Sequence, residues 1–298
     1  MALIVTEGLT RGYGKRPGIV GLNLSVEEGS LFGFLGPNGA GKTTTIRVLL
    51  GFLRPGAGRA GIFGLDCFRD SHRIKAEVGY LPGDVRLYPW MTGDLALRIF
   101  GRVRGRDLRA AGGELAEDLE LDLGVKVREM SRGMRQKLGL ILTLAPNPRL
   151  LVLDEPSSGL DPLTQEKLRR RLRDLTRAGH TVFFSSHVLR EVEELCDRVA
   201  IVRAGRLVVE EGIEALRAKA AREVEIRFRG GETPNGLDLP SFLKAGTRGP
   251  STIRGRLEGP VAPLLEWLAG KPVEDLSIER PDLESLFRSY YASPEGEA

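Results

Sequence analysis

The stretch GPNGAGKTT, residues 36–44, decides how this chain folds. It matches the pattern G-x-x-x-x-G-K-S/T, follows the apolar run LFGFL at residues 31–35, and precedes a helical pattern. A glycine-rich loop between a strand and a helix lets backbone N–H groups converge on an anion, and the helix N-terminus adds a favourable partial charge. We therefore expect a P-loop that binds nucleotide phosphates.

The side chains of this loop have separate predicted roles. Lys42 should reach the β- and γ-phosphates of ATP, and the Thr43 hydroxyl should ligate Mg²⁺. ATP and Mg²⁺ are therefore the expected ligands. The residues expected to contact ATP in this loop are Gly36, Pro37, Asn38, Gly39, Ala40, Gly41, Lys42, Thr43 and Thr44.

A second stretch supplies acidic residues. Four apolar residues at 150–153 precede Asp154 and Glu155, which is typical of a parallel strand buried on both faces. Asp154 at the strand end would hold Mg²⁺, and Glu155 would accept a proton from the attacking water. An apolar run that ends in two acids is commonplace alone, but the P-loop upstream favours a hydrolytic site.

The segment MSRGMRQ, residues 130–136, resembles the signature of the ABC family, usually written L-S-G-G-Q. Arg132 and Met134 are departures from it. From the residues alone, Ser131 can cap the following helix, and Gly133 leaves backbone N–H groups open. The resemblance implies more: Ser131, Arg132, Gly133 and Met134 would contact the γ-phosphate of an ATP bound by the opposite subunit.

Other stretches support the same resemblance. Residues 156–162, PSSGLDP, resemble the D-loop of the family, and SSH at 185–187 resembles its switch motif, which makes His187 a γ-phosphate contact. Tyr13 resembles the aromatic residue that stacks on adenine, although a packing role is the alternative. Gly83 stands where the family usually has Gln, so either Asp84 contributes the metal contact from one position further on or that contact is absent.

The resemblance covers roughly residues 2–215 and implies an α/β fold, a P-loop NTPase of the ABC type. We expect an N-terminal antiparallel β-subdomain and an inserted helical subdomain at about residues 85–145. Near residue 220 the pattern resets to alternating residues, VEIRF at 224–228. The predicted domains are therefore an ATPase domain at 1–219 and a small C-terminal α+β appendage at 220–298.

Composition excludes several protein classes. The formal net charge is +4, from 44 basic and 40 acidic residues, and the arginines are mostly scattered, so we expect no nucleic-acid partner. Arginine runs at 102–106 and 169–173 are interpreted as solvated surfaces. Two distant cysteines exclude a disulfide framework and favour a reducing compartment. No stretch has the ~20 apolar residues of a membrane span, and the first residues do not form a signal peptide.

A finer resemblance is to ATPases of ABC-2 type exporters, including the daunorubicin-resistance type. It depends on GYLPGD at 79–84, LYP at 87–89 and the tail at 281–291. It implies a cytoplasmic ATP-hydrolysing subunit, peripheral on the inner face of the cell membrane, that powers separate permease chains. Its partner in a head-to-tail pair would be a second copy or a paralogous ATPase.

Two other functions are compatible with a nucleotide-binding chain. A soluble ABC ATPase acting on ribosomes or DNA would be favoured by tandem cassettes or a long coiled-coil insertion, and the sequence has neither. A nucleotide-binding regulator without turnover would not need Glu155 and His187, and both are present.

Overall fold

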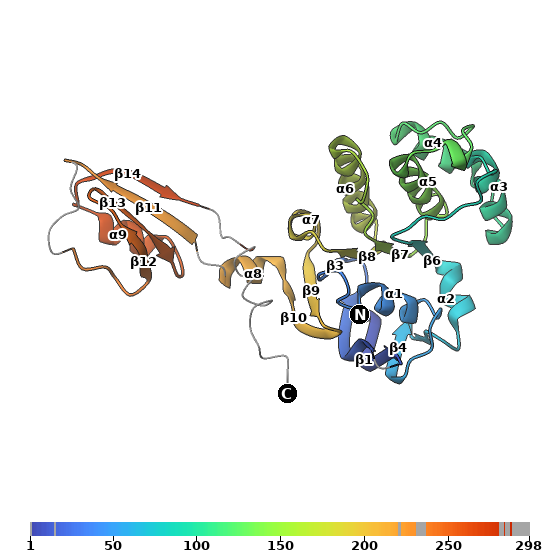
Figure 1. Cartoon of the computed structure of the whole chain (residues 1–298), viewed down its shortest axis with the longest axis horizontal. Helices are drawn as coiled ribbons and strands as arrows, with labels where there is room; N and C mark the ends of the chain where they lie inside the picture. The colour runs from blue at the N-terminus through green and yellow to red at the C-terminus, as the bar shows by residue number, and fades with distance from the viewer. Residues whose placement is uncertain are drawn as a thin grey trace. The chain divides into compact units, whose positions relative to one another are not determined.

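The computed structural model describes residues 2–14, 16–219, 222–230, 237–279, 283 and 287. The chain divides into two compact units, residues 1–210 and 211–298. Figure 1 shows their helices and strands. The division falls within strand β10 (Arg206–Gly212), ahead of the boundary expected after residue 219.

The centre of the first unit is a six-stranded sheet in the order β10-β9-β3-β8-β7-β6, in which β9, β3, β8, β7 and β6 run parallel. Every residue of β3, β7 and β8 is buried, because helices α1, α6 and α7 pack against these strands. Continuous apolar runs are typical of such strands. Their bounds are β3 Leu31–Leu35, β6 Val78–Leu81, β7 Leu150–Asp154, β8 Thr181–Ser186 and β9 Arg198–Arg203. The helices are α1 Lys42–Leu49, α6 Pro162–Arg177 and α7 Leu189–Leu195.

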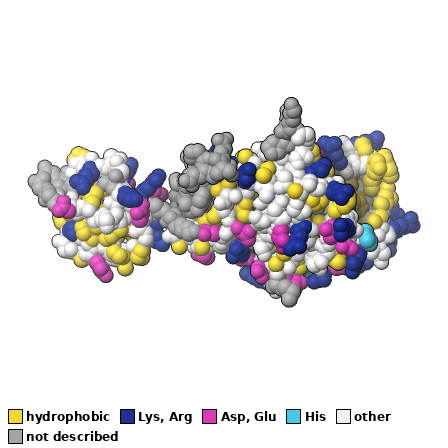
Figure 2. Space-filling model, turned by 90° about the horizontal axis from the view of Figure 1, so that it is seen from below, with side chains coloured by type: hydrophobic (Ala, Val, Ile, Leu, Met, Phe, Trp, Pro, Cys, Tyr) yellow, Lys and Arg dark blue, Asp and Glu magenta, His cyan; other side chains and the backbone are white. Residues whose placement is uncertain are grey.

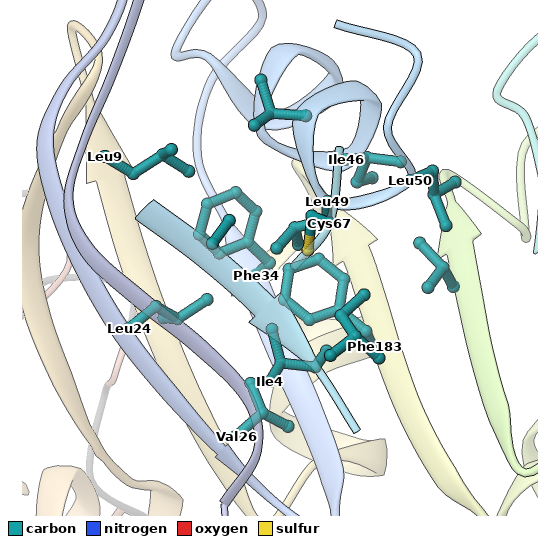
Figure 3. Packing of buried hydrophobic residues seen from close by; sticks show 14 of the residues in the cluster. Ile4, Leu9, Leu24, Val26, Phe34, Ile46, Leu49, Leu50, Cys67 and Phe183 are labelled. Atoms are coloured by element: carbon teal, nitrogen blue, oxygen red, sulfur yellow. The ribbon is translucent and has the colours of Figure 1, made fainter. Parts of the chain in front are cut away.

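An antiparallel sheet in the order β2-β1-β4-β5 packs onto the parallel sheet through a shared apolar core. Figure 3 shows Ile4 and Leu24 from this sheet meeting Phe34 and Phe183 from the parallel sheet. The rings of Phe34 and Phe183 lie 5.2 Å apart, and Phe32 stacks on Phe183 at 6.0 Å. The strands are β1 Ala2–Tyr13, β2 Arg16–Glu27, β4 Ala57–Ile62 and β5 Leu65–Asp66.

The helical segment inserted between β6 and β7 lies within the range expected from the sequence. Thr92 caps α3 by accepting a hydrogen bond from the Leu95 N–H, and Gly105 ends the helix in the left-handed conformation. Helices α3, α4 and α5 pack on one another. Their bounds are α3 Gly93–Arg104, α4 Arg109–Asp118 and α5 Arg132–Leu144, with α2 Ser71–Glu77 before β6 and η1 Val127–Glu129 before α5.

The second unit has its own core, formed by one face of a four-stranded antiparallel sheet and helix α9. The alternating strand expected at 224–228 is present, with Val224, Ile226 and Phe228 buried. The tail at 281–291 lies outside the described residues except for positions 283 and 287. The elements are α8 Ile213–Lys219, β11 Arg222–Phe228, β12 Leu243–Arg248, β13 Thr252–Leu257, α9 Ala262–Leu268 and β14 Val273–Ile278.

Within the described parts of both units, every helix is too short or too polar to span a bilayer.

We expect Phe183→Ala to lower the free energy of unfolding of the first unit by about 3–5 kcal/mol, because it removes a fully buried ring between Phe32 and Phe34. Urea denaturation followed by circular dichroism measures this change. Val103→Ala is the control, because Val103 is 83% exposed and its loss should change stability by less than about 0.5 kcal/mol. Equal stability of the two variants would contradict the described core.

Candidate functional site

The loop between β3 and α1 requires glycine where the backbone turns sharply. Gly41 has φ 103°, and a Cβ at this position would lie 2.4 Å from the carbonyl oxygen of Gly18. A Cβ at Gly36 would lie 2.5 Å from the carbonyl oxygen of Val202. The loop is therefore held between two neighbouring backbone segments, and side chains at these positions would displace it.

Lys42 is the first residue of α1, and its side chain reaches back to the loop. Its buried ammonium donates to the carbonyl oxygen of Gly36 at 2.5 Å and to that of Pro37 at 3.4 Å. It also lies 3.3 Å from Glu155 Oε1. A positive charge is thus held where the loop N–H groups begin α1, an arrangement suited to an anionic ligand.

Asp154 ends strand β7 and is buried. Its two carboxylate oxygens accept hydrogen bonds from the hydroxyls of Thr43 at 2.8 Å and Ser185 at 3.0 Å. A hydroxyl and a carboxylate beside a phosphate loop fit Mg²⁺, which binds through one or two carboxylates and the phosphates of its substrate. Burial, and to a smaller extent the negative charge of Asp154, raises the pKa of Tyr80 to about 12.

Glu155 adopts an unusual backbone conformation, with φ 51°. Its N–H donates to the carbonyl oxygen of Ser185, and its Oε2 is joined to His187 Nδ1 by a 2.7 Å hydrogen bond. Its Oε1 makes no hydrogen bond in the described part of the chain and has only the ionic contact with Lys42. Left-handed backbone in a non-glycine residue costs about 1–3 kcal/mol and is concentrated at functional sites.

Sequence reasoning missed the residue that holds this turn. Gln136, buried on α5, donates to the carbonyl oxygen of Pro156 at 3.0 Å and approaches that of Glu155 at 3.4 Å. The only trace of this role in the sequence is that Gln136 is a single amide residue just before the apolar run of α5. The sequence also did not indicate that Ser185 binds Asp154, because the SSH segment at 185–187 was interpreted only through His187.

The signature segment forms a separate group around the start of α5. Ser131 caps the helix by accepting from the Met134 N–H at 3.1 Å, as expected. Arg132 donates to the Ser158 hydroxyl at 2.8 Å, and a Cβ at Gly133 would lie 2.7 Å from the carbonyl oxygen of Gly159. Among the described residues, the hydrogen bonds of 131–134 stay within the start of α5 or, for Arg132, lead to the neighbouring loop, and none leads to the P-loop of the same chain.

Tyr13 lies near the end of the P-loop. Its ring is 44% exposed, and its hydroxyl is 3.5 Å from the Thr44 hydroxyl. An exposed flat ring beside the phosphate loop leaves a surface on which a base can stack. The stacking role stays a prediction.

Asp84 does not share in this cluster. It pairs with Arg86 at 2.7 Å, and both side chains are largely exposed. Gly83 is the nearer neighbour of the metal-binding position, since a Cβ on Gly83 would lie 3.7 Å from the Asp154 carboxylate. The metal-binding role of Asp84 therefore stays a prediction that these contacts do not support.

Comparisons with known proteins all indicate the same family. The family model described as ABC transporter matches residues 19–158. The daunorubicin resistance ATP-binding protein DrrA3 of Streptomyces coeruleorubidus is 35% identical, with 95% of this chain and 94% of that protein aligned. The bacitracin transport ATP-binding protein BcrA of Bacillus licheniformis is 37% identical over 76% of this chain and 75% of its own length.

Solved structures agree with these sequence relatives. An ATP-binding subunit of an ABC transporter superposes with a TM-score of 0.68 at 27% identity, covering 72% of this chain and 92% of that one. The fold is shared with the ATP-binding cassette MJ0796 in a dimeric post-hydrolysis state with ADP and Pi, with a TM-score of 0.63 at 23% identity over 70% of this chain and 98% of that one.

We expect Lys42→Ala to reduce ATP binding and hydrolysis by at least about 10²-fold, because it removes the buried charge that stabilises the phosphates. Equilibrium binding of a fluorescent ATP analogue and a phosphate-release assay measure the two effects. Lys126→Ala is the control, because Lys126 is exposed and carries the same charge. Activity close to that of the control would remove Lys42 from the site.

Proposed function

Because the chain belongs to the ABC transporter family of ATP-binding, ATP-hydrolysing proteins, we propose that it powers a separate membrane permease of the ABC-2 exporter type. Three relatives support export, since they are named for daunorubicin resistance, bacitracin transport and Nod factor export. None of these three relatives is named for an action on ribosomes or DNA, which is the soluble alternative.

One observation carries the catalytic proposal: Glu155 lies between Lys42 and His187, directly after Asp154. In this arrangement Lys42 binds the β- and γ-phosphates, and His187 contacts the γ-phosphate. Glu155 accepts a proton from a water molecule as the water oxygen attacks the γ-phosphorus and the bond to the bridging oxygen of ADP breaks.

Thr43 and Asp154 are the proposed holders of Mg²⁺, with Ser185 fixing the second oxygen of Asp154. When bound, Mg²⁺ neutralises charge that develops on the phosphates. ATP must also compete with Glu155 for the ammonium of Lys42, because the two side chains form an ion pair in the described structure. Phosphate binding therefore frees the Glu155 carboxylate to act on water.

The signature group is the basis for a proposed partner. Ser131 caps its own helix and Arg132 binds the neighbouring loop, so this segment is available to the ATP of a second subunit. Two chains, identical or paralogous, would close head to tail over two ATP molecules, and hydrolysis would reopen them. ATP then shifts the population between an open and a closed pair.

The segment at 84–90 is the proposed contact with the permease. Tyr88 and Trp90 are 68% and 60% exposed, and their rings stack at 5.7 Å. Exposed aromatic pairs of this kind mark protein interfaces, because they offer large rigid contact areas. A subunit bound there would lie on the inner face of the cell membrane.

We expect Glu155→Gln to reduce turnover by about 10²–10⁴-fold while ATP binding survives, because Gln keeps the shape of the side chain but cannot accept the proton. The variant should accumulate as an ATP-bound dimer, visible by size-exclusion chromatography with ATP and Mg²⁺ but not with ADP. Glu117→Gln, on the exposed face of α4, is the matched control and should behave like the unmodified chain.

Two outcomes would count against this mechanism. Normal hydrolysis by Glu155→Gln would exclude Glu155 as the base. Loss of turnover without an ATP-dependent dimer would leave the base in place and contradict pairing by the soluble chain alone.

We also expect a chain that ends at residue 219 to bind ATP with an unchanged dissociation constant. Every proposed nucleotide contact lies between Tyr13 and His187, and the sheet of the second unit has a separate core. The cut follows α8 because Ile213 and Leu216 are buried. The measurement is the same fluorescent-analogue titration, with a thermal melt to show that the shortened chain is folded. A folded chain that has lost ATP binding would contradict the proposal.

A further inference from the structure

A short segment around the end of helix α3 carries a strong positive charge. Residues 98–109 contain five arginines and one aspartate, a net charge of +4. The run at 169–173 on α6 carries four further arginines, so positive charge alone does not distinguish the α3 segment. The proposed ATPase site uses none of these arginines, so their clustering needs another explanation.

The segment encloses an arginine-lined hollow at the end of α3. Its volume is about 430 Å³. The floor includes the buried side chains of Leu97 and Leu108. The arginines that line it are Arg98, Arg102, Arg106 and Arg109.

These arginines differ in how their charge is used. Arg109 forms a bidentate pair with Asp107, with Nε on Oδ1 and Nη2 on Oδ2, and Arg106 donates to the carbonyl oxygen of Pro146. Arg98 and Arg102 are exposed, and neither guanidinium group makes a hydrogen bond or an ion pair with any described residue. They are four positions apart on α3, so their side chains lie on the same face, one turn from each other. Two neighbouring guanidinium groups are thus free to bind an anion.

An apolar ridge lies beside this pair on the same helix. Ile99 and Val103 are also four positions apart, and Val103 is 83% exposed, while Phe100 is partly exposed beside them. Figure 2 shows hydrophobic side chains gathered next to Lys and Arg at the end of the first unit where α2 and α3 lie. A soluble surface seldom leaves such a ridge uncovered.

We propose that this face of α3 binds the surface of a bilayer that contains anionic phospholipids. Arg98 and Arg102 bind headgroup phosphates, whose planar oxygen pairs match the guanidinium fork. Ile99, Phe100 and Val103 enter the boundary between headgroups and acyl chains. An arginine row beside an apolar row is the pattern of helices that lie in the membrane interface, and an anionic leaflet attracts such segments.

The charge pattern favours lipid over the permease as the occupant. The proposed permease contact, Tyr88 and Trp90, is a stacked aromatic pair, whereas the α3 face combines Ile99, Phe100 and Val103 with arginines that pair with no described residue. Arg104, next to this face, serves a different purpose. It donates to the carbonyl oxygens of Ala76 and Val78 and so fixes α3 to the end of α2. The inference extends the proposed location at the membrane, but it needs neither the permease nor nucleotide.

The test is sedimentation of the full chain, without nucleotide or permease, with vesicles of phosphatidylcholine alone or mixed with phosphatidylglycerol. We expect binding to the mixed vesicles only. The double variant Arg98→Gln and Arg102→Gln should bind about 30-fold more weakly, since each arginine near an anionic surface contributes about fivefold. The matched control, Arg170→Gln and Arg171→Gln on the exposed face of α6, removes the same charge and should bind within about threefold of the unmodified chain. Val103→Ser should weaken binding without changing its dependence on phosphatidylglycerol.

Three results would overturn the proposal. The first is equal loss in the α3 and α6 double variants, which would indicate net charge alone. The second is release of the chain from vesicles by millimolar glycerol phosphate, which would indicate a site for free phosphate compounds. The third is binding only when a permease is present in the vesicles, whatever their lipid charge. The ATPase and dimer assays contain no lipid. A negative vesicle result therefore leaves the ATPase proposal intact, and a negative ATPase or dimer result leaves the lipid-binding proposal intact.

Discussion

The parallel pairing of β3, β8 and β7 brings the chemistry of this protein together. Its register places Leu35 beside Ser186 and Asp154 beside Ser185, so three strand ends meet at one edge of the sheet. The start of α1, after the loop that follows β3, supplies Lys42 and Thr43, β7 supplies Asp154, and β8 leads to His187. Ligands of open parallel sheets bind at this edge because the carboxyl ends of the strands leave backbone groups and loops free there.

The same edge carries a cost that the surrounding structure has to offset. Glu155 has a left-handed backbone, which is unfavourable by about 1–3 kcal/mol. Ser185 accepts its N–H, and Gln136 binds the carbonyl groups that follow. Since the side chain is also shared between Lys42 and His187, phosphate binding and release of the carboxylate are physically linked. Preorganised charges of this kind need little rearrangement at the moment of reaction.

The helical segment between β6 and β7 connects the proposed surfaces. Its α5 begins at the signature group and carries Gln136, while its α3 presents the arginine and apolar rows. Because α3, α4 and α5 pack on one another, a shift of the signature group on ATP would move α3 as well. Nucleotide, permease and lipid contacts would then act on one packed body.

The sequence alone determined the elements whose signals are local. The P-loop, the buried strand before Asp154, the Ser131 cap and the alternating strand at 224–228 are visible because burial and turn chemistry repeat over a few residues. The tertiary structure alone decided which distant groups meet: Gln136 beneath Glu155, Ser185 on Asp154, Arg132 on Ser158, and Gly83 facing Asp154 while Asp84 turns to Arg86. It also separated Arg98 and Arg102, whose guanidinium groups pair with no described residue, from Arg104, Arg106 and Arg109, which bind carbonyl or carboxylate groups. Periodicity predicts which side chains are buried, but pairing across many residues depends on the packing of the whole core.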